Sequence, residues 1–352
     1  MSGYELQTFF LSPLTSGLIF ALLALGVFIA YRVLDIADLS VEGIFPLVTV
    51  FSCFLLLRGW NPFLVVLLMM VIGVVAGIIN ACLSLYLKIP PLLSGIIMMA
   101  ALFAIAIILV KLNNGQVNLD ASTFTVFSWF SDLLLSWGLS KVWVNFLSPI
   151  VITAIFLGLS MGGIYFFFGT EMGLALRASG KNKQMAKANG INVKLMTIIG
   201  LAISSLLVAL SATLYAQKNL TGSPQDGQGM IVLGLSTLFL GEAIIPHASF
   251  KMHLWATLGG SFVYWYIIQI LFQFVPKSDT FLYLYKALLL VLVLAIPYLL
   301  QRYKKKRARR LVDEKEAKEH ATHPGDDFAK DEEVRRGFIE VTPTFEEQGF
   351  RA

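Results

Sequence analysis

Carboxylates that stand next to apolar stretches are the side chains in this sequence whose chemistry is most informative. Asp38 and Glu42 come just before the apolar stretch 44–57, and Glu242 lies near the end of the apolar stretch 230–245. A carboxylate at membrane depth is costly, so it marks a functional site by default. These three residues are therefore candidates for lining the path of a polar solute.

Each candidate also has a structural interpretation. Asp38 and Ser40, the latter a further pathway candidate, are good N-cap residue types and could cap the helix that follows them. Asp35 is expected to form an ion pair with Arg32 at one face of the membrane. Glu242 is interpreted equally well as a gate or interface residue and as an interfacial anchor.

Three more polar side chains complete the candidate pathway. Asn80 lies within the apolar stretch 62–87, where it either bonds a neighbouring helix or contacts the solute. Gln225 and Asp226 lie in the glycine-rich stretch 217–229, which leads into the second short apolar stretch. Non-helical backbone at membrane depth is tolerated only under a cover of protein or beside a water-filled cavity. We therefore expect any part of this stretch that dips into the membrane to face the central pathway.

Metal and enzymatic chemistry are not expected. His247 and His253 have only Glu242 as a further ligand type nearby. Cys53 and Cys82 lie in apolar segments without a ligand cluster, so they are expected to pack as small apolar residues rather than form a disulfide or a metal site. The sequence contains no G-x-x-x-x-G-K-[ST] phosphate-binding loop and no nucleophile paired with a base. We expect neither enzyme activity nor a cofactor on this chain.

The composition is that of a membrane protein. Of the 352 residues, 57% are hydrophobic and 14% are charged, whereas about a quarter of the residues of a soluble domain are charged. About 20 apolar residues cross the ~30 Å hydrocarbon layer. Stretches that approach or exceed this length are Phe9–Tyr31, Pro62–Leu87, Pro91–Val110, Phe146–Phe168, Leu195–Ala216, Leu254–Phe274 and Phe281–Leu300. We predict an all-α polytopic membrane protein, whose first stretch is a membrane helix rather than a signal peptide because no cation precedes it.

The order of long and short stretches indicates an internal repeat. Residues 9–111 and 195–300 each contain a long stretch, a polar interruption, a short apolar stretch and two further long stretches. Residues 146–194 separate the copies by one helix and a loop, which would give the copies opposite orientations. We predict a transmembrane domain over residues 1–300, with about nine membrane segments arranged as an inverted repeat. The alternative is that the two short stretches re-enter the membrane without crossing it.

Two segments outside these stretches have distinct compositions. Residues 301–352 are highly charged and are expected to be a disordered cytoplasmic tail or a short solvated helix. Residues 124–139 are aromatic and amphipathic and are expected to lie along the membrane surface. The net charge of +5 is attributed to cations on one side of the membrane rather than to nucleic acid binding.

The polar interruption of residues 169–194 is the most cationic loop between the apolar stretches. It holds one acid, Glu171, and the cations Arg177, Lys181, Lys183, Lys187 and Lys194. Its pattern predicts two short helices, the first ending at Gly180, the second beginning with Asn182 as its N-cap and ending at Gly190. Lys and Arg concentrate in cytoplasmic loops, so this loop and the C-terminus are placed inside and the N-terminus outside.

Two motifs resemble a known family. The run DIADLSVEG (residues 35–43) is similar to the N-terminal signature of the branched-chain amino acid and ribose permease superfamily. The residues that resemble this superfamily's cytoplasmic coupling loop are Gly173, Arg177, Ala178, Gly180, Asn182, Ala186, Asn189, Gly190 and Ile191. The resemblance covers roughly residues 8–300. The nearest branch looks like that of tryptophan/tyrosine-type importer permeases.

The resemblance implies the permease subunit of an ATP-binding cassette (ABC) importer in a bacterial inner membrane. Such a subunit works as a homodimer with an extracytoplasmic substrate-binding protein and with two cytoplasmic ATPase subunits, which hold the ATP and Mg²⁺. It implies an amino acid substrate, aromatic in the nearest branch. The residues expected to couple the permease to its ATPase are Glu171, Gly173, Arg177, Ala178, Gly180, Lys181, Asn182, Lys183, Ala186, Asn189, Gly190 and Ile191.

Two other functions fit parts of the sequence. An ion- or proton-coupled secondary transporter would also have inverted repeats and short segments, but it would need ionisable residues in mid-membrane. A membrane scaffold or receptor could use the cationic loop and the tail for protein contacts, but it would not require paired short segments. The sequence alone does not identify the solute.

Overall fold

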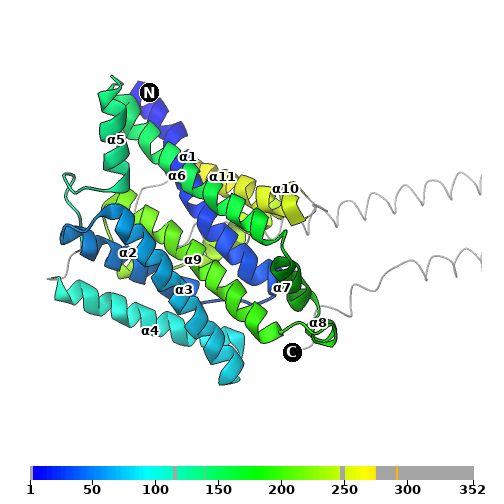
Figure 1. Ribbon diagram of the computed structural model, residues 1–352. Coiled ribbons are helices and arrows are strands. Elements are labelled where there is room, and N and C mark those ends of the chain that lie inside the picture. Colours follow the sequence, from blue (N-terminus) through cyan, green and yellow to red (C-terminus); the bar gives the residue numbers. More distant parts are fainter. Residues whose placement is uncertain (1–2, 114–116, 139, 246–249, 275–290, 292–352) are drawn as a thin grey trace, which may run out of the picture. The chain divides into compact units, whose positions relative to one another are not determined.

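Long helices dominate the computed structural model, which describes residues 3–113, 117–138, 140–245, 250–274 and 291. Every regular element within these residues is a helix, and all of them belong to one unit, Met1–Leu294 (Figure 1). The predicted membrane stretch 281–300, apart from Val291, and the charged segment 301–352 lie outside the described residues. The membrane helix and the charged tail predicted for these residues therefore remain predictions.

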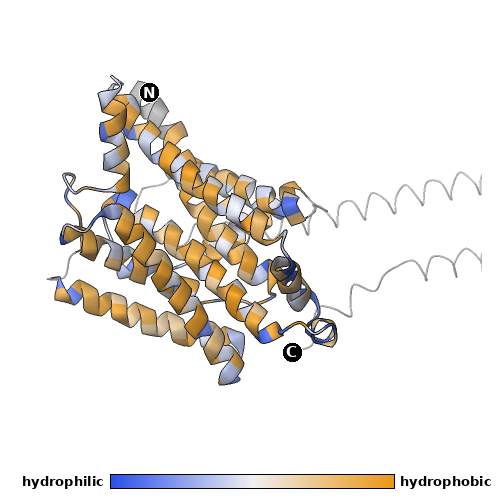
Figure 2. Ribbon diagram, in the orientation of Figure 1, coloured by the Kyte–Doolittle hydropathy of each residue, from blue (hydrophilic) through white to orange (hydrophobic). Residues whose placement is uncertain are grey.

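Seven spans of the described chain are long and apolar enough to cross a membrane. They are formed by α1 (Gly3–Phe28) with its π-helical end η1 (Ile29–Val33), α3 (Pro62–Tyr86), α4 (Pro91–Leu112), α6 (Lys141–Phe167), α9 (Val193–Asn219), the 3₁₀ turn η2 (Pro224–Gly227) with α10 (Met230–Ile244), and α11 (Phe250–Phe274). Figure 2 shows apolar residues along these helices. The predicted long stretches within the described residues are thereby confirmed.

The remaining described α-helices are shorter: α2 (Val41–Leu57), α5 (Val126–Ser136), α7 (Glu171–Lys181) and α8 (Lys183–Ala188). α2 has 17 residues, so the first short apolar stretch is confirmed as short. α10 has only 15 residues, but it reaches the length of a span when η2 is added. The prediction of about nine membrane segments remains untested, because its last stretch is outside the described residues.

The centre of the bundle is formed by α1, α2 and α9. α1 packs along α9, α11 and α10, and side chains such as Leu23 are fully buried there. Two hydroxyl groups of α9 donate to backbone carbonyl oxygens of α1: Ser204 to Gly26 at 2.7 Å and Ser211 to Ile19 at 2.8 Å. These hydrogen bonds satisfy polar groups at membrane depth and fix the two helices against each other.

α3 approaches α9 through small residues. A Cβ atom on Gly73 would lie 2.5 Å from the Cβ of Ala209, and one on Gly77 would lie 2.6 Å from the carbonyl oxygen of Leu201. Both distances are too short for non-bonded atoms. The two helices can therefore lie this close only because these positions are glycine.

α5 covers the end of α9 that is remote from α7 and α8. Thr125 caps α5 in a reciprocal capping box with Ser128, and Gln217 of α9 accepts a hydrogen bond from the Val126 N–H at 3.0 Å. Trp129 and Trp137 are exposed. The amphipathic segment 124–139 thus contains a helix, α5, whereas its position along a membrane surface stays a prediction.

Gly77→Leu is expected to lower the free energy of unfolding by about 1–3 kcal/mol, because the new side chain must push α3 away from α9. The measurement is thermal or denaturant unfolding of the purified chain in detergent. Gly158→Leu on α6 is the matched control, since no described heavy atom lies within 4 Å of a Cβ built there. Equal losses in both variants would contradict the close α3–α9 contact.

Candidate functional site

The chain between η1 and α2 is not helical, and we call residues 34–40 the first lead-in. η1 closes with two hydrogen bonds, from Leu34 N–H to the Ile29 carbonyl oxygen and from Ile36 N–H to the Ala30 carbonyl oxygen. Asp35 has a φ of +57°, the left-handed conformation that ends many helices. The lead-in therefore turns sharply away from the axis of α1 before α2 begins.

Asp38 is the buried polar centre of the first lead-in. Asp38 is only 4% exposed. Its Oδ1 accepts hydrogen bonds from the Ser40 N–H and from Asn80 Nδ2, each at 2.9 Å. Ser40 stands at the N-cap position of α2, but its hydroxyl makes no capping hydrogen bond. The interpretation that Ser40 caps α2 is therefore wrong, whereas Asp38 does accept a backbone N–H at the start of this helix. Asp38 also holds the lead-in to α3.

Asn80 continues this connection to a third segment. Its Oδ1 accepts a hydrogen bond from Ser94 Oγ of α4 at 2.9 Å, so the lead-in, α3 and α4 are joined by Asp38, Asn80 and Ser94. The expected interhelical role of Asn80 is confirmed. The second carboxylate oxygen of Asp38 is buried and makes no well-formed hydrogen bond to any described residue.

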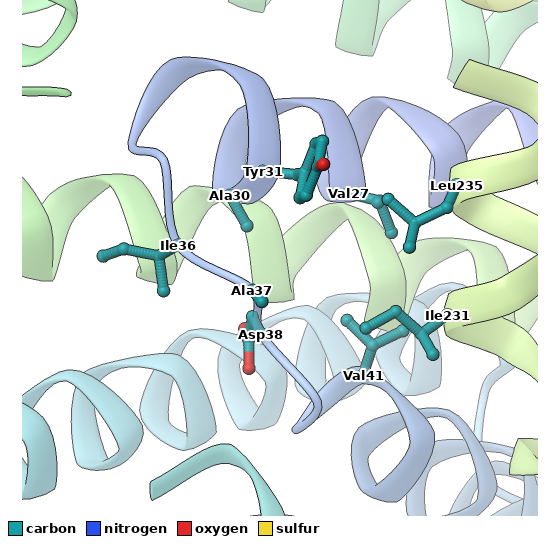
Figure 3. A pocket seen from close by; sticks show the side chains of 9 residues that line it. All are labelled: Val27, Ala30, Tyr31, Ile36, Ala37, Asp38, Val41, Ile231 and Leu235. Carbon is teal, nitrogen blue, oxygen red and sulfur yellow. The ribbon is translucent and has the colours of Figure 1, made fainter. Parts of the chain in front are cut away.

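A small apolar cavity of about 40 Å³ lies beside the first lead-in. Figure 3 shows Val27 and Tyr31 on one side of it and Ile231 and Leu235 of α10 on another, with the Asp38 carboxylate pointing away from α10. The structure thus brings the first lead-in against α10. The polar part of Asp38 faces α3 and α4 rather than the cavity.

The chain before α10 forms a second lead-in, residues 220–229. It begins at Leu220, whose φ is +55°, and its Asp226 accepts a hydrogen bond from the Ser223 N–H at 2.8 Å. A Cβ on Gly227 would lie 2.2 Å from the carbonyl oxygen of Glu42, so η2 packs directly on α2. Of the predicted pathway residues here, Gln225 is exposed, and Asp226 closes the turn.

Arg32 and Glu242 form an ion pair between η1 and α10. Their Nε and Oε1 atoms are 3.0 Å apart, and the side chains are 53% and 23% exposed. The contact lacks the alignment of a hydrogen bond. The expected pairing of Arg32 with Asp35 is wrong, because the left-handed backbone turns the exposed Asp35 away from the helix. Glu242 could not be found as the partner from the sequence, since more than half of the chain separates the two residues.

The cationic loop folds as two short helices at one end of the bundle. Asn182 caps α8 by accepting hydrogen bonds from the Gln184 and Met185 N–H groups, each at 3.0 Å. Gly190 has a φ of +76°, as predicted for the end of this helix. The prediction that α7 ends at Gly180 is wrong, because α7 continues to Lys181.

Gly180 has a packing role instead. A Cβ at this position would lie 1.8 Å from the carbonyl oxygen of Val33, so α7 lies directly against the end of η1. Arg177 donates from Nη2 to the Phe168 carbonyl oxygen at 3.1 Å, and its guanidinium lies 4.8 Å from the ring centroid of Phe250. α7 is thereby fastened to η1, to the end of α6 and to the start of α11.

The predicted coupling residues divide into two sets. Gly173 and Ala186 are buried, and Arg177, Gly180 and Ile191 are partly buried. The exposed members are Glu171, Ala178, Lys181, Asn182, Lys183, Asn189 and Gly190. The prediction from charge missed three exposed apolar side chains on the same two helices. They are Met172, Leu174 and Met185, which are 48%, 54% and 64% exposed.

Comparison of the sequence with known proteins identifies the family of this chain. Residues 9–297 match the family described as branched-chain amino acid transport system, permease component. The chain belongs to this family. The permease is 31% identical to a tyrosine transport system permease protein of Clostridioides difficile over 258 residues, which cover 73% of this chain and 81% of the relative. No solved structure matches the permease at a significant level.

Two further relatives of the permease are more distant. A fructose import permease protein of Bifidobacterium longum is 24% identical over 61% of this chain and 57% of its own length. An uncharacterized protein of Rickettsia prowazekii is 25% identical over 66% of this chain and 77% of its own. Family membership and the seven apolar spans make the permease a multi-pass membrane protein and a transport subunit rather than an enzyme.

The described part of the permease contains no group of three or more side chains placed to hold a metal ion, and His247 lies outside that part. Cys53 and Cys82 are both free thiols, the first buried. Among the predicted pathway residues, Asp38 and Asn80 are in direct contact, and the backbone of Glu42 meets that of Gly227, the neighbour of Asp226. Glu242 lies apart from them, at the end of α10.

Asn80→Leu is expected to lower the free energy of unfolding by about 1.5–3 kcal/mol, because it leaves the buried Asp38 carboxylate without its donor from α3. Adding Asp38→Leu removes the group that needs the donor. The double variant should therefore lose less than the sum of the two single variants, measured by denaturant unfolding in detergent. Strictly additive losses would show that the two side chains are not coupled.

Proposed function

We propose that the permease is the membrane-spanning subunit of an ABC importer that moves an amino acid inward with energy from a separate ATPase chain. The observation that carries this proposal is the construction of the α7–α8 segment. Its outer surface offers Met185 between the cations Lys181, Lys183 and Lys187, all exposed. An exposed apolar side chain within a charged rim is typical of a protein interface.

The inner surface of α7 supports a coupling role. Gly180 lies against Val33 of η1, and Arg177 binds the end of α6 and contacts the ring of Phe250 on α11. Because these contacts are close-packed, a displacement of α8 by a bound ATPase would be transmitted to three membrane segments at once. A loop that merely connected α6 to α9 would have no need of such contacts.

The arrangement of helices supports an inverted repeat. α1, α2 and α3 would correspond to α9, α10 and α11. α3 packs along α9, and α11 packs along α1. In each case the third helix of one copy packs on the first helix of the other copy, as a repeat of this kind requires. In both copies a residue with positive φ, Asp35 or Leu220, ends the long helix and begins a lead-in. The repeat partner of α4 would be residues 281–300, which are outside the described residues.

The proposed pathway follows the two lead-ins. Short or broken segments in matching positions of the two copies are the usual place of a transporter's solute path. We assign to it the predicted residues Asp38, Ser40, Glu42, Asn80, Gln225, Asp226 and Glu242. In this assignment the Arg32–Glu242 ion pair closes the seam between η1 and α10 at the end that carries α7 and α8. That end is placed in the cytoplasm because it carries the cationic loop.

The substrate class is proposed from the relatives. The tyrosine transport permease is the more similar and covers more of both chains than the fructose import permease, so we favour an amino acid over a sugar. We further propose a homodimer in a bacterial inner membrane, with an extracytoplasmic substrate-binding protein. ATP and Mg²⁺ would bind to the ATPase subunits alone.

The first test is co-purification of the permease, in a mild detergent, with ATPase subunits from the cells that express it. The wild-type chain should bring down an ATPase in stoichiometric amount, and Met185→Glu should weaken that association at least about tenfold, because a charge would enter the apolar centre of the contact. Lys141→Glu, an exposed cation at the opposite end of the bundle, is the control. A wild-type eluate with no ATPase would contradict the proposed function.

The seam between η1 and α10 gives a second test. Glu242→Arg places two cations together, so we expect the transport rate to fall about tenfold or more, because the seam no longer closes. Arg32→Glu combined with Glu242→Arg restores opposite charges and should recover most of the wild-type rate. The measurement is uptake of labelled L-tyrosine into cells at equal expression. Failure of the double variant to exceed both single variants would show that the pair does not close the pathway.

A further inference from the structure

Lys218 is a cation that faces the inside of the bundle. It lies in the last turn of α9, at the end remote from α7 and α8, and it is partly buried. Its Nζ is 3.5 Å from Ser16 Oγ of α1. Among the described residues no carboxylate lies within ion-pair distance of it, since the one such pair there is that of Arg32 and Glu242.

The other described cations near this end are placed differently. Arg58, Lys111 and Lys141 are all exposed, and the guanidinium of Arg58 lies 4.2 Å from the ring centroid of Phe54. A lysine near the end of a membrane helix can extend along lipid to reach water. Lys218 differs because its face of α9 packs on α1, as the hydrogen bond from Ser211 to Ile19 shows.

A layer of aromatic rings lies one turn deeper than Lys218. The ring of Phe20 on α1 is 5.6 Å from that of Tyr215 on α9 and 4.8 Å from that of Trp265 on α11. Ser16 precedes Phe20 by one turn, and Lys218 follows Tyr215 by one turn on the antiparallel helix. α1 and α9 therefore place a hydroxyl and a cation one helical turn from an aromatic layer, to which α11 contributes Trp265.

One polar group in this layer has no hydrogen-bond partner among the described residues. The indole Nε1 of Trp265 is buried and makes no hydrogen bond to any described residue. A partly buried cation whose hydrogen bond goes to a neutral hydroxyl, and a buried donor without an acceptor in the described chain, are both costly in a membrane protein. The cost at Lys218 would be relieved by a solute that carries an anionic oxygen, because charge-assisted hydrogen bonds are the stronger ones.

We infer that Lys218 and Ser16 form a site that takes the carboxylate of an aromatic amino acid, with the ring of the solute directed toward Phe20, Tyr215 and Trp265. Aromatic rings pair favourably in stacked or edge-to-face arrangements, so the layer would select for an aromatic side chain. This inference rests on the proposed import function and specifies its substrate class. It places the first contact of the solute with the permease at the end opposite the ATPase.

Protection from chemical labelling tests the site without relying on transport. The permease, purified with its ATPase in lipid nanodiscs, is treated with limiting acetic anhydride in the presence of L-tyrosine or of tyramine, which lacks the carboxylate. At L-tyrosine concentrations of about four times its Kd, acetylation of Lys218 should fall about fivefold. Tyramine should give no such protection. Lys111 and Lys141 serve as internal controls, because both should be acetylated equally under all conditions.

Two outcomes of the labelling experiment would overturn the inference. One is equal acetylation of Lys218 with L-tyrosine and with tyramine. The other is a Lys218 that the anhydride does not reach in the absence of solute, since a site closed to that small reagent cannot admit a carboxylate.

Uptake of labelled L-tyrosine separates this inference from the proposed function. Lys218→Met should slow uptake about tenfold or more through the loss of a charge-assisted hydrogen bond, whereas Lys218→Arg should retain most of it. Lys111→Met is the matched control. If the wild-type permease has no ATPase partner or no uptake, the proposed function fails. If the wild type imports L-tyrosine and Lys218→Met imports it equally fast, this inference alone fails.

Discussion

The hydrogen bonds of Asp38 hold together the part of the bundle on which the rest depends. A chain that leaves its helix at membrane depth must satisfy its own backbone polar groups, because lipid offers no partners. Here Asp38 binds the Ser40 N–H and Asn80 within a fully buried setting. These bonds fix where α2 begins, and the carbonyl oxygen of Glu42 on α2 in turn receives η2 at Gly227. Both lead-ins are therefore positioned by one buried carboxylate.

The end of α1 connects this interior to the surface. Val33 lies against Gly180 of α7, and Arg32, its neighbour, lies against Glu242 of α10. The proposed ATPase contact and the proposed seam thus depend on two consecutive residues of η1. Coupling between a partner and a solute path requires a physical connection of this kind, in which one element has contacts in both places.

Features set by local physics could be predicted from the sequence. The apolar stretches gave the membrane helices through their length alone, and Asn182 and Gly190 bounded α8 because capping depends on residue type and φ. Features set by distant contacts could not. Gly180 looked like a helix end but serves close packing, and Arg32 pairs with Glu242 rather than with the nearby Asp35. Each outcome depends on which helix lies opposite, and a single sequence does not contain that information in readable form.

The π-helical turn at the end of α1 has a consequence for how the proposed seam between η1 and α10 would open. Its Leu34 N–H bonds the Ile29 carbonyl oxygen five residues earlier, so the turn holds one residue more than an α-helical turn. Removing that extra residue by converting the turn to α geometry would rotate the segment beyond it by about 100°. Arg32 lies within this turn, so the direction of its side chain toward α10 depends on the hydrogen-bonding register of the turn. A change of that register would redirect a charged side chain while the helix stays intact.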